Sequence, residues 1–247
     1  MSYRSTYLVC AILLGLAAAS EPVHAGVTGT AALTSDYVFR GVSQSNSDPA
    51  IQAGFEGASD NGWYLGTWGS SISWLSDLSA TDAKISSSVE IDVYGGYRGK
   101  FSEAVSFDAG AIYYAYPGEF PSGFNDADTA ELYFGIGVGI FSAKYFYSVT
   151  DLFGYVDSDG SSYLDLGANW GFAEGWTLNL HAGRQWIESN EDFEYTDWKV
   201  GATKAFANGF SLAVAYTDTN ADDALYTNPF GTEIADGTVA LTLTKAF

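Results

Sequence analysis

The sequence predicts an all-β protein, a transmembrane antiparallel up-and-down β-barrel of about 12 strands. Three observations predict this fold: apolar and polar residues alternate along many short segments, the connectors alternate between tight turns and long acidic loops, and the chain ends on an amphipathic strand whose last residue is Phe247. A period of two indicates a strand with one apolar and one polar face. In a barrel wall the apolar face meets lipid and the polar face lines the lumen.

The first 25 residues have the pattern of a secretory signal peptide. Arg4 supplies a positive charge, Leu8 to Ala19 form an apolar core, and Val23-His24-Ala25 has the small-residue spacing of a cleavage site. The apolar core is shorter than the roughly 20 residues that a spanning helix needs. We therefore expect export of the chain and a single barrel domain over residues 26–247.

Composition excludes several classes of function. The chain has 30 acidic and 10 basic residues and a formal net charge of −20, so no basic face could neutralise the phosphates of a nucleic acid. The one cysteine, Cys10, lies in the signal segment, which leaves the mature chain without a disulfide framework or a thiol site. We expect no cofactor and no bound metal.

Twelve segments carry the strand pattern. An even number of strands suits a single-chain bacterial barrel, although 10 or 14 strands stay open as alternatives because the first two hairpins and the 129–149 region have soft boundaries. The predicted strands are 27–39, 50–57, 63–72, 87–98, 105–116, 129–140, 142–149, 161–170, 176–185, 195–203, 210–217 and 237–247.

The connectors between these segments are of two kinds. Tight turns with Gly or Asn-Gly, such as Asp60-Asn61-Gly62, alternate with longer acidic loops, such as Pro117 to Asp128 and Asp218 to Asp236. Short periplasmic turns facing long extracellular loops are typical of an outer-membrane barrel. Both termini are therefore expected in the periplasm, and aromatic residues at the strand ends, from Tyr37 and Phe39 to Phe247, are expected to form two girdles facing lipid.

Several motifs resemble those of the TorF family of outer-membrane porins. They include Ser-Asp-Tyr-Val-Phe-Arg-Gly-Val-Ser-Gln-Ser at 35–45 and Glu-Ile-Asp-Val-Tyr-Gly-Gly-Tyr at 90–97, and the resemblance covers nearly all of the mature chain. It implies an outer-membrane barrel that acts as a channel, and it transfers no substrate and no catalytic residue. The apolar position shortly before the terminal aromatic is Lys245 here, and a lysine at the interface can extend its amine toward water.

Strand parity places a set of charged side chains in the lumen, because a charge facing lipid at mid-depth would cost several kcal/mol. The predicted lumen-lining residues are Asp36, Arg40, Glu90, Asp92, Arg98, Asp108, Glu131, Lys144, Asp165, Asp197 and Lys199. The excess of acids predicts a pore that favours cations or neutral solutes over anions. The alternative is that these residues pair across the interior and plug it, and for Asp197 and Lys199 pairing is the expected use.

Arg40 lies near the end of the first predicted strand and shares parity with Asp36. We expect the two to pair at the extracellular mouth or to hold the Gly41–Asp48 loop against the wall. An ordinary surface ion pair, worth under about 1 kcal/mol, is the alternative.

The function predicted from the sequence is passive passage of small solutes or cations through the outer membrane. A plugged structural or adhesive barrel, acting through its acidic loops and the apolar patch within 218–236, is the alternative, and a barrel hydrolase built around His181 lacks a motif. Expected partners are the lipid bilayer, lipopolysaccharide, the transported solutes, and the barrel-assembly machinery through the C-terminal strand that ends at Phe247.

Overall fold

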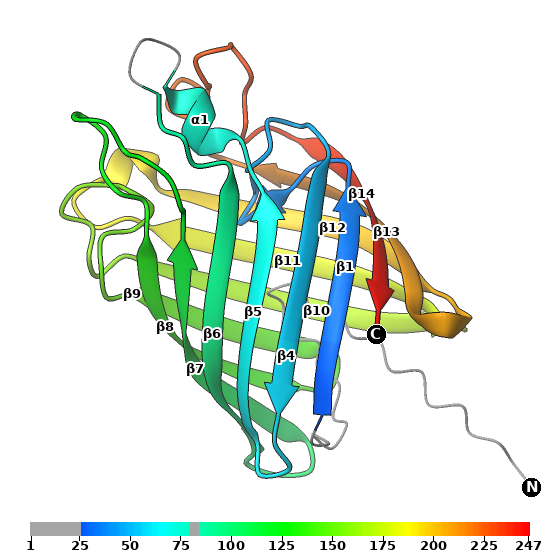
Figure 1. Ribbon diagram of the computed structural model, residues 1–247. Helices are drawn as coiled ribbons and strands as arrows, with labels where there is room; N and C mark the ends of the chain where they lie inside the picture. The colour runs from blue at the N-terminus through cyan, green and yellow to red at the C-terminus, as the bar shows by residue number, and fades with distance from the viewer. Residues whose placement is uncertain (1–25, 80–83) are drawn as a thin grey trace, which may run out of the picture.

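The computed structural model describes residues 26–79 and 84–247, in which twelve antiparallel strands close into a barrel (Figure 1). Each strand pairs with the next along the chain, and the last pairs with the first, with Leu33 opposite Leu243. The fold class predicted from the sequence is confirmed, including the count of twelve. The wall strands are β1 (Gly26–Thr34), β4 (Ala50–Ala58), β5 (Trp63–Ser71), β6 (Val89–Lys100), β7 (Val105–Ala115), β8 (Thr129–Val138), β9 (Phe141–Ser148), β10 (Ser162–Ala173), β11 (Trp176–Trp186), β12 (Tyr195–Ala205), β13 (Phe210–Thr219) and β14 (Thr238–Ala246).

The predicted signal peptide falls on residues 1–25, which lie outside the described residues. None of the helices in the described ranges is long and apolar enough to cross a bilayer.

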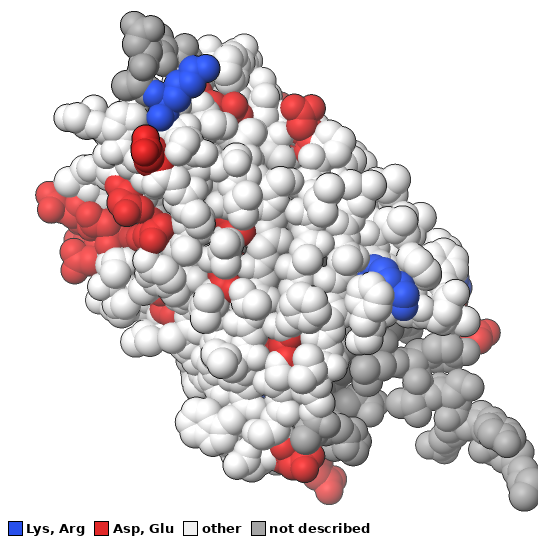
Figure 2. Space-filling model, viewed as in Figure 1, with Lys and Arg blue, Asp and Glu red and all other residues white. Residues whose placement is uncertain are grey.

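The strands have one apolar outer face and one polar or aromatic inner face. Along β8, Leu132, Phe134 and Ile136 are exposed on the outside, whereas Glu131 and Tyr133 are buried inside. Figure 2 shows an outer wall that is nearly free of charged side chains, with acidic residues gathered over the loops beside β8 and β9. The period of two therefore separates a lipid-facing surface from a polar interior.

The first predicted strand, 27–39, is wrong at its end. β1 stops at Thr34, and residues 35–49, here called the plug segment, turn into the lumen and form the short hairpin of β2 (Val38–Phe39) and β3 (Val42–Ser43). Positive φ angles of 46° at Arg40 and 85° at Gly41 make the tight turn at its tip. Tyr37 and Phe39 consequently pack inside the barrel, and their predicted place in the lipid-facing girdle is wrong.

The long connectors cover one end of the barrel. They carry α1 (Trp74–Leu78), η1 (Glu191–Phe193) and the loop between β13 and β14, and they gather at the end opposite the tight turns (Figure 1). The tight turns close the other end, where η2 (Ala207–Gly209) links β12 to β13. This arrangement matches the predicted alternation of long loops and short turns.

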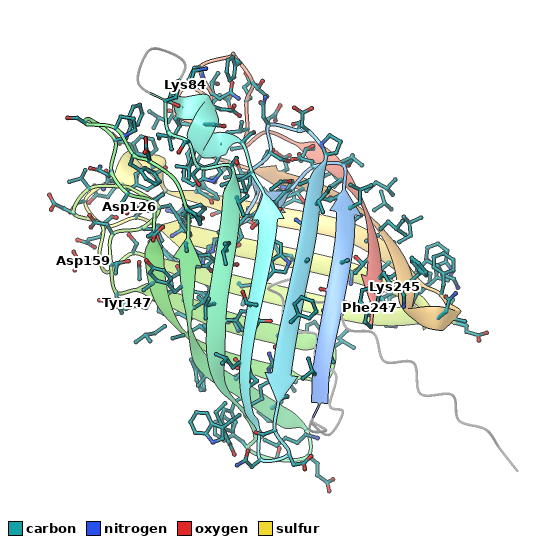
Figure 3. The ribbon with its side chains drawn as sticks, viewed as in Figure 1. Lys84, Asp126, Tyr147, Asp159, Lys245 and Phe247 are labelled. Atoms are coloured by element: carbon teal, nitrogen blue, oxygen red, sulfur yellow. The ribbon has the colours of Figure 1, made fainter. Side chains whose placement is uncertain are left out.

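The C-terminal strand carries its lysine at an edge of the apolar surface (Figure 3). The Lys245 amine donates to the carbonyl oxygens of Asn208 and Ala246 at 2.8 and 2.6 Å, and it lies 5.0 Å from the centroid of the Phe247 ring. Its stem therefore covers aromatic surface while its charge reaches backbone oxygens at a turn.

A charge on the outer wall should be far more costly than the same charge on the inner wall. Val200 of β12 points outward and is 45 % exposed, so we expect Val200→Lys to lower the free energy of unfolding in lipid by about 2–4 kcal/mol. Ala213→Lys is the matched control, since Ala213 points inward between Thr203 and Thr242. Denaturant titration in vesicles measures both variants, and equal losses would contradict the assigned faces.

Candidate functional site: the barrel lumen

The tip of the plug segment is fixed in the lumen by one buried ion pair. The Arg40 guanidinium donates to both carboxylate oxygens of Glu131 on β8, at 3.0 and 2.7 Å, and to the amide oxygen of Gln185 on β11 at 3.1 Å. The two charged side chains are 5 % and 0 % exposed. A bidentate arginine–carboxylate pair combines charge with a defined geometry. It joins the plug segment to the wall at β8, and the bond to Gln185 adds β11, three strands away around the barrel.

Aromatic rings surround the same guanidinium. Its central carbon lies 4.4 Å from the centroid of Tyr163 on β10 and 5.0 Å from that of Phe146 on β9, and the rings of Phe39 and Phe153 lie 4.9 and 5.9 Å away. The face of an aromatic ring attracts a cation, and more strongly where water is excluded. The seat of Arg40 is therefore a cage of rings closed by one carboxylate.

The stem of the plug segment is also bound to the wall. The Tyr37 hydroxyl donates to Glu90 of β6 at 2.8 Å, while the Asp36 carboxylate accepts from the hydroxyls of Ser43 and Ser45 at 2.6 and 3.2 Å. Asp36 thus folds the segment onto itself instead of pairing with Arg40. The predicted Asp36–Arg40 pair is wrong, and so is the alternative of a surface ion pair.

The last long loop holds the plug segment from outside. The Ser43 backbone N–H donates to the Ile234 carbonyl at 2.7 Å, and the Asn228 side-chain amide donates to the Asn46 side-chain oxygen at 2.7 Å. Tyr226 of this loop is buried against Val42, and burial raises the pKa of its hydroxyl well above the ordinary value. The hydroxyl therefore stays protonated and donates to the Phe193 carbonyl at 2.7 Å.

The apolar patch in that loop is divided between two environments. Tyr226 packs inward over the mouth, whereas Phe230 is 64 % exposed. The loop thus covers the mouth without itself forming the constriction in the lumen.

Below the plug segment, charged and tyrosine side chains form a belt along the wall from β4 to β12. Arg98 binds both carboxylate oxygens of Glu56 at 2.5 and 2.9 Å, and Lys144 donates to Asp108 at 3.1 Å. Asp108 also accepts from the Tyr64 hydroxyl. Acids and bases alternate along this polar belt, so its charges are largely balanced where they occur.

His181 completes the polar belt on β11. Its Nδ1 lies 3.3 Å from Asp165 and its Nε2 lies 2.6 Å from Asp197, and the Tyr163 hydroxyl donates to the other oxygen of Asp197 at 2.8 Å. With a carboxylate at each ring nitrogen, both nitrogens serve as donors and the ring is held as an imidazolium. Its contacts are those of an ion-pair network, and no serine or threonine hydroxyl is among its partners in the described part of the chain.

The structure places all eleven predicted residues on the lumen side, and their role as pore lining stays a prediction. Within residues 26–79 and 84–247, Lys199 forms no ion pair, so the predicted Asp197–Lys199 pair is wrong; His181 takes that partner instead. Strand parity also places Glu56 inside the barrel, but its role as the ion-pair partner of Arg98 becomes visible only in the structure. No pattern in the sequence around Gln185, Phe146, Phe153 or Tyr163 indicates that these residues surround Arg40.

The excess of acidic over basic side chains in the lumen lies around the plug segment. Asp36, Glu90, Asp92 and Glu131 are each at most 4 % exposed, and Arg40 is the cation among them. One oxygen of Asp92, Oδ1, has no hydrogen-bond partner. Among the described residues no cluster of three or more histidine, cysteine or acidic side chains is arranged to hold a metal ion.

The fold is similar to those of solved outer-membrane channels. The KdgM porin has a TM-score of 0.55 and 9 % identity over 90 % of this chain and 99 % of its own, and the NanC porin has a TM-score of 0.56 and 11 % identity over the same shares. The toluene transporter TodX of P. putida has a TM-score of 0.53 and 12 % identity, covering 94 % of each chain. At these identities the similarity shows a shared fold.

The sequence itself matches no curated protein. It does match the model of a family described as "Bacterial protein of unknown function (Gcw_chp)" over residues 17–247. The chain therefore belongs to the Gcw_chp family.

Proposed function

We propose that this protein is an outer-membrane channel for passive passage of small solutes, held shut in this conformation by the plug segment. One observation carries the proposal: a porin-like barrel is occupied by a single infolded segment whose tip is fixed by Arg40 and Glu131. Because the segment is not a wall strand, it can leave without breaking the barrel ladder. Passage of solute then requires its displacement.

The acidic side chains of the wall favour the passage of cations and neutral solutes over the passage of anions. When the plug segment leaves, it removes Arg40 and Asp36, and Glu90, Asp92 and Glu131 stay on β6 and β8. Such a cluster in a low-dielectric wall attracts cations and repels anions. The KdgM porin has been solved with oligogalacturonate, an acidic sugar, and this chain's lumen is unsuited to a ligand of that charge.

We infer that residues 1–25 direct export, that the barrel-assembly machinery recognises the strand ending at Phe247, and that the acidic loops meet lipopolysaccharide. Membership of the TorF porins is also proposed, on the motifs at 35–45 and 90–97. The ion-pair network around His181 supports a non-enzymatic role.

A plugged barrel that acts through its loops is the second candidate. The acidic side chains over β8 and β9, among them Asp126 and Asp159, support it (Figures 2 and 3). Deleting 222–234 separates the two: greater conductance supports a loop that secures the plug segment, whereas unchanged conductance with lost surface binding supports adhesion.

Gly41→Ala should open the channel. A Cβ at Gly41 would lie 2.5 Å from Thr219 Cγ2 and 2.6 Å from Asp197 Cβ, so the tip of the plug segment must move. We expect a higher open probability in planar bilayers. Gly231→Ala is the control, because its φ of 83° resembles the 85° of Gly41 while nothing lies within 4 Å of its Cβ. Equal effects of the two variants would contradict the proposed gate.

Glu131→Gln should be strongly destabilising, because it leaves the Arg40 charge buried without a carboxylate. Breaking a buried ion pair costs about 3–5 kcal/mol. Glu56→Gln is the control, since Arg98 is 35 % exposed and water can solvate it. We expect a much smaller loss for that variant in thermal unfolding of detergent-solubilised protein, and comparable losses would show that the Arg40 pair is not essential.

Opened channels should prefer cations. With a KCl gradient across a bilayer containing Gly41→Ala protein, we expect a reversal potential of cationic sign. Adding Glu90→Gln should reduce it, because this removes one of the carboxylates on the wall. A preference for anions, or no effect of the added substitution, would reject this origin of selectivity.

A further inference from the structure

We propose that the seat of Arg40 is a binding site for small organic cations that bear a guanidinium group, and that Arg40 occupies it as a tethered substitute for such a solute. The inference rests on the proposed channel function and names its substrate class.

The polar part of the site matches a planar, forked cation. Glu131 accepts two parallel hydrogen bonds and Gln185 accepts a third, so at least three N–H groups of Arg40 are matched. The Tyr114 hydroxyl donates to Glu131 Oε2 at 3.1 Å and helps to fix the carboxylate. A compact ammonium group cannot form the fork, which makes guanidinium the preferred ligand.

The apolar part of the site matches the faces of the same cation. Tyr163 lies 4.4 Å and Phe146 5.0 Å from the guanidinium carbon, and Phe153 contributes a further ring from the loop after β9. Aromatic cages of this kind recognise organic cations through their ring faces. An inorganic ion such as K⁺ would gain less, because it has no planar surface to stack.

Most of the site is formed by wall residues, which stay in place when the plug segment is displaced. Glu131, Phe146, Tyr163 and Gln185 lie on β8, β9, β10 and β11, which are consecutive neighbours in the barrel. Of the four rings, Phe39 alone belongs to the plug segment. Departure of the segment would therefore leave an empty cage with a buried carboxylate, which a free solute can neutralise.

Competition follows from this arrangement. Arg40 is linked covalently to its site, so its effective concentration is high and a free guanidinium compound competes weakly with it. Once the side chain is removed, the same compound should bind without competition. Arg40→Gly is the suitable variant, because φ at residue 40 is 46° and glycine adopts that angle without strain.

The first experiment titrates Arg40→Gly protein in detergent with ethylguanidinium and follows thermal unfolding. We expect a saturable rise of the unfolding midpoint, no saturable rise with ethylammonium or with neutral propionamide, and loss of the effect in Arg40→Gly/Glu131→Gln. A non-saturable response, or the same response in the double variant, would overturn the proposal.

The second experiment leaves Arg40 in place and does not depend on how that variant folds. Gln44 is 8 % exposed within the plug segment, and Gln44→Cys would supply the one thiol of the mature chain. We expect ethylguanidinium, and not ethylammonium at equal ionic strength, to speed maleimide labelling of this cysteine by several-fold. An unchanged labelling rate would count against competition with Arg40.

Conductance distinguishes this inference from the proposed function. If Gly41→Ala channels conduct ions but Arg40→Gly protein shows no saturable binding of ethylguanidinium, the proposed binding site is rejected and the proposed channel function is retained. If Arg40→Gly protein binds ethylguanidinium saturably but no variant conducts ions, the binding site is supported and the channel function is rejected.

Discussion

The whole structure depends on one constraint: backbone polar groups in hydrocarbon must find their partners within the protein. A closed sheet satisfies this requirement, since every strand has two neighbours and no edge is left. Here β14 pairs with β1 to complete the ring of twelve strands. Closure then imposes the two-faced sequence of each strand, with Leu132 and Phe134 outside and Glu131 and Tyr133 inside β8.

Closure at twelve strands leaves a wide space inside the barrel that must be filled. A ring of this size, with strands about 4.8 Å apart and tilted by about 40°, has a radius near 12 Å, too wide for wall side chains alone to fill. In this chain the polar belt occupies one level and the plug segment the level above it. The segment brings Arg40 to a carboxylate that burial would otherwise leave uncompensated, so filling the space and balancing the charge are one arrangement.

The sequence predicted the wall because its signal is local and periodic. Parity alone places Glu90, Asp92 and Glu131 inside, and the turn residues separate the strands. It could not predict the plug segment, because Val38 and Phe39 continue the alternation after β1 has ended. What redirects the chain is distant in sequence: Asp36 meets Thr238, and Arg40 meets Glu131, 91 residues away. Partners at such separations leave no trace in a local pattern. Strand parity likewise predicts Lys199, two residues away, as the partner of Asp197, whereas the partner in the structure is His181 on the neighbouring strand.

The most direct test of the central claim removes the plug segment and keeps the wall. Thr34 and Ala50 are register partners on β1 and β4, so residues 35–49 can be replaced by an Asn-Gly turn that joins the two strands without altering the ladder. Single-channel recording should then show a steadily open, cation-preferring pore, where the unmodified protein is mostly closed. A variant that forms the same barrel and conducts no more than the unmodified protein would contradict the account.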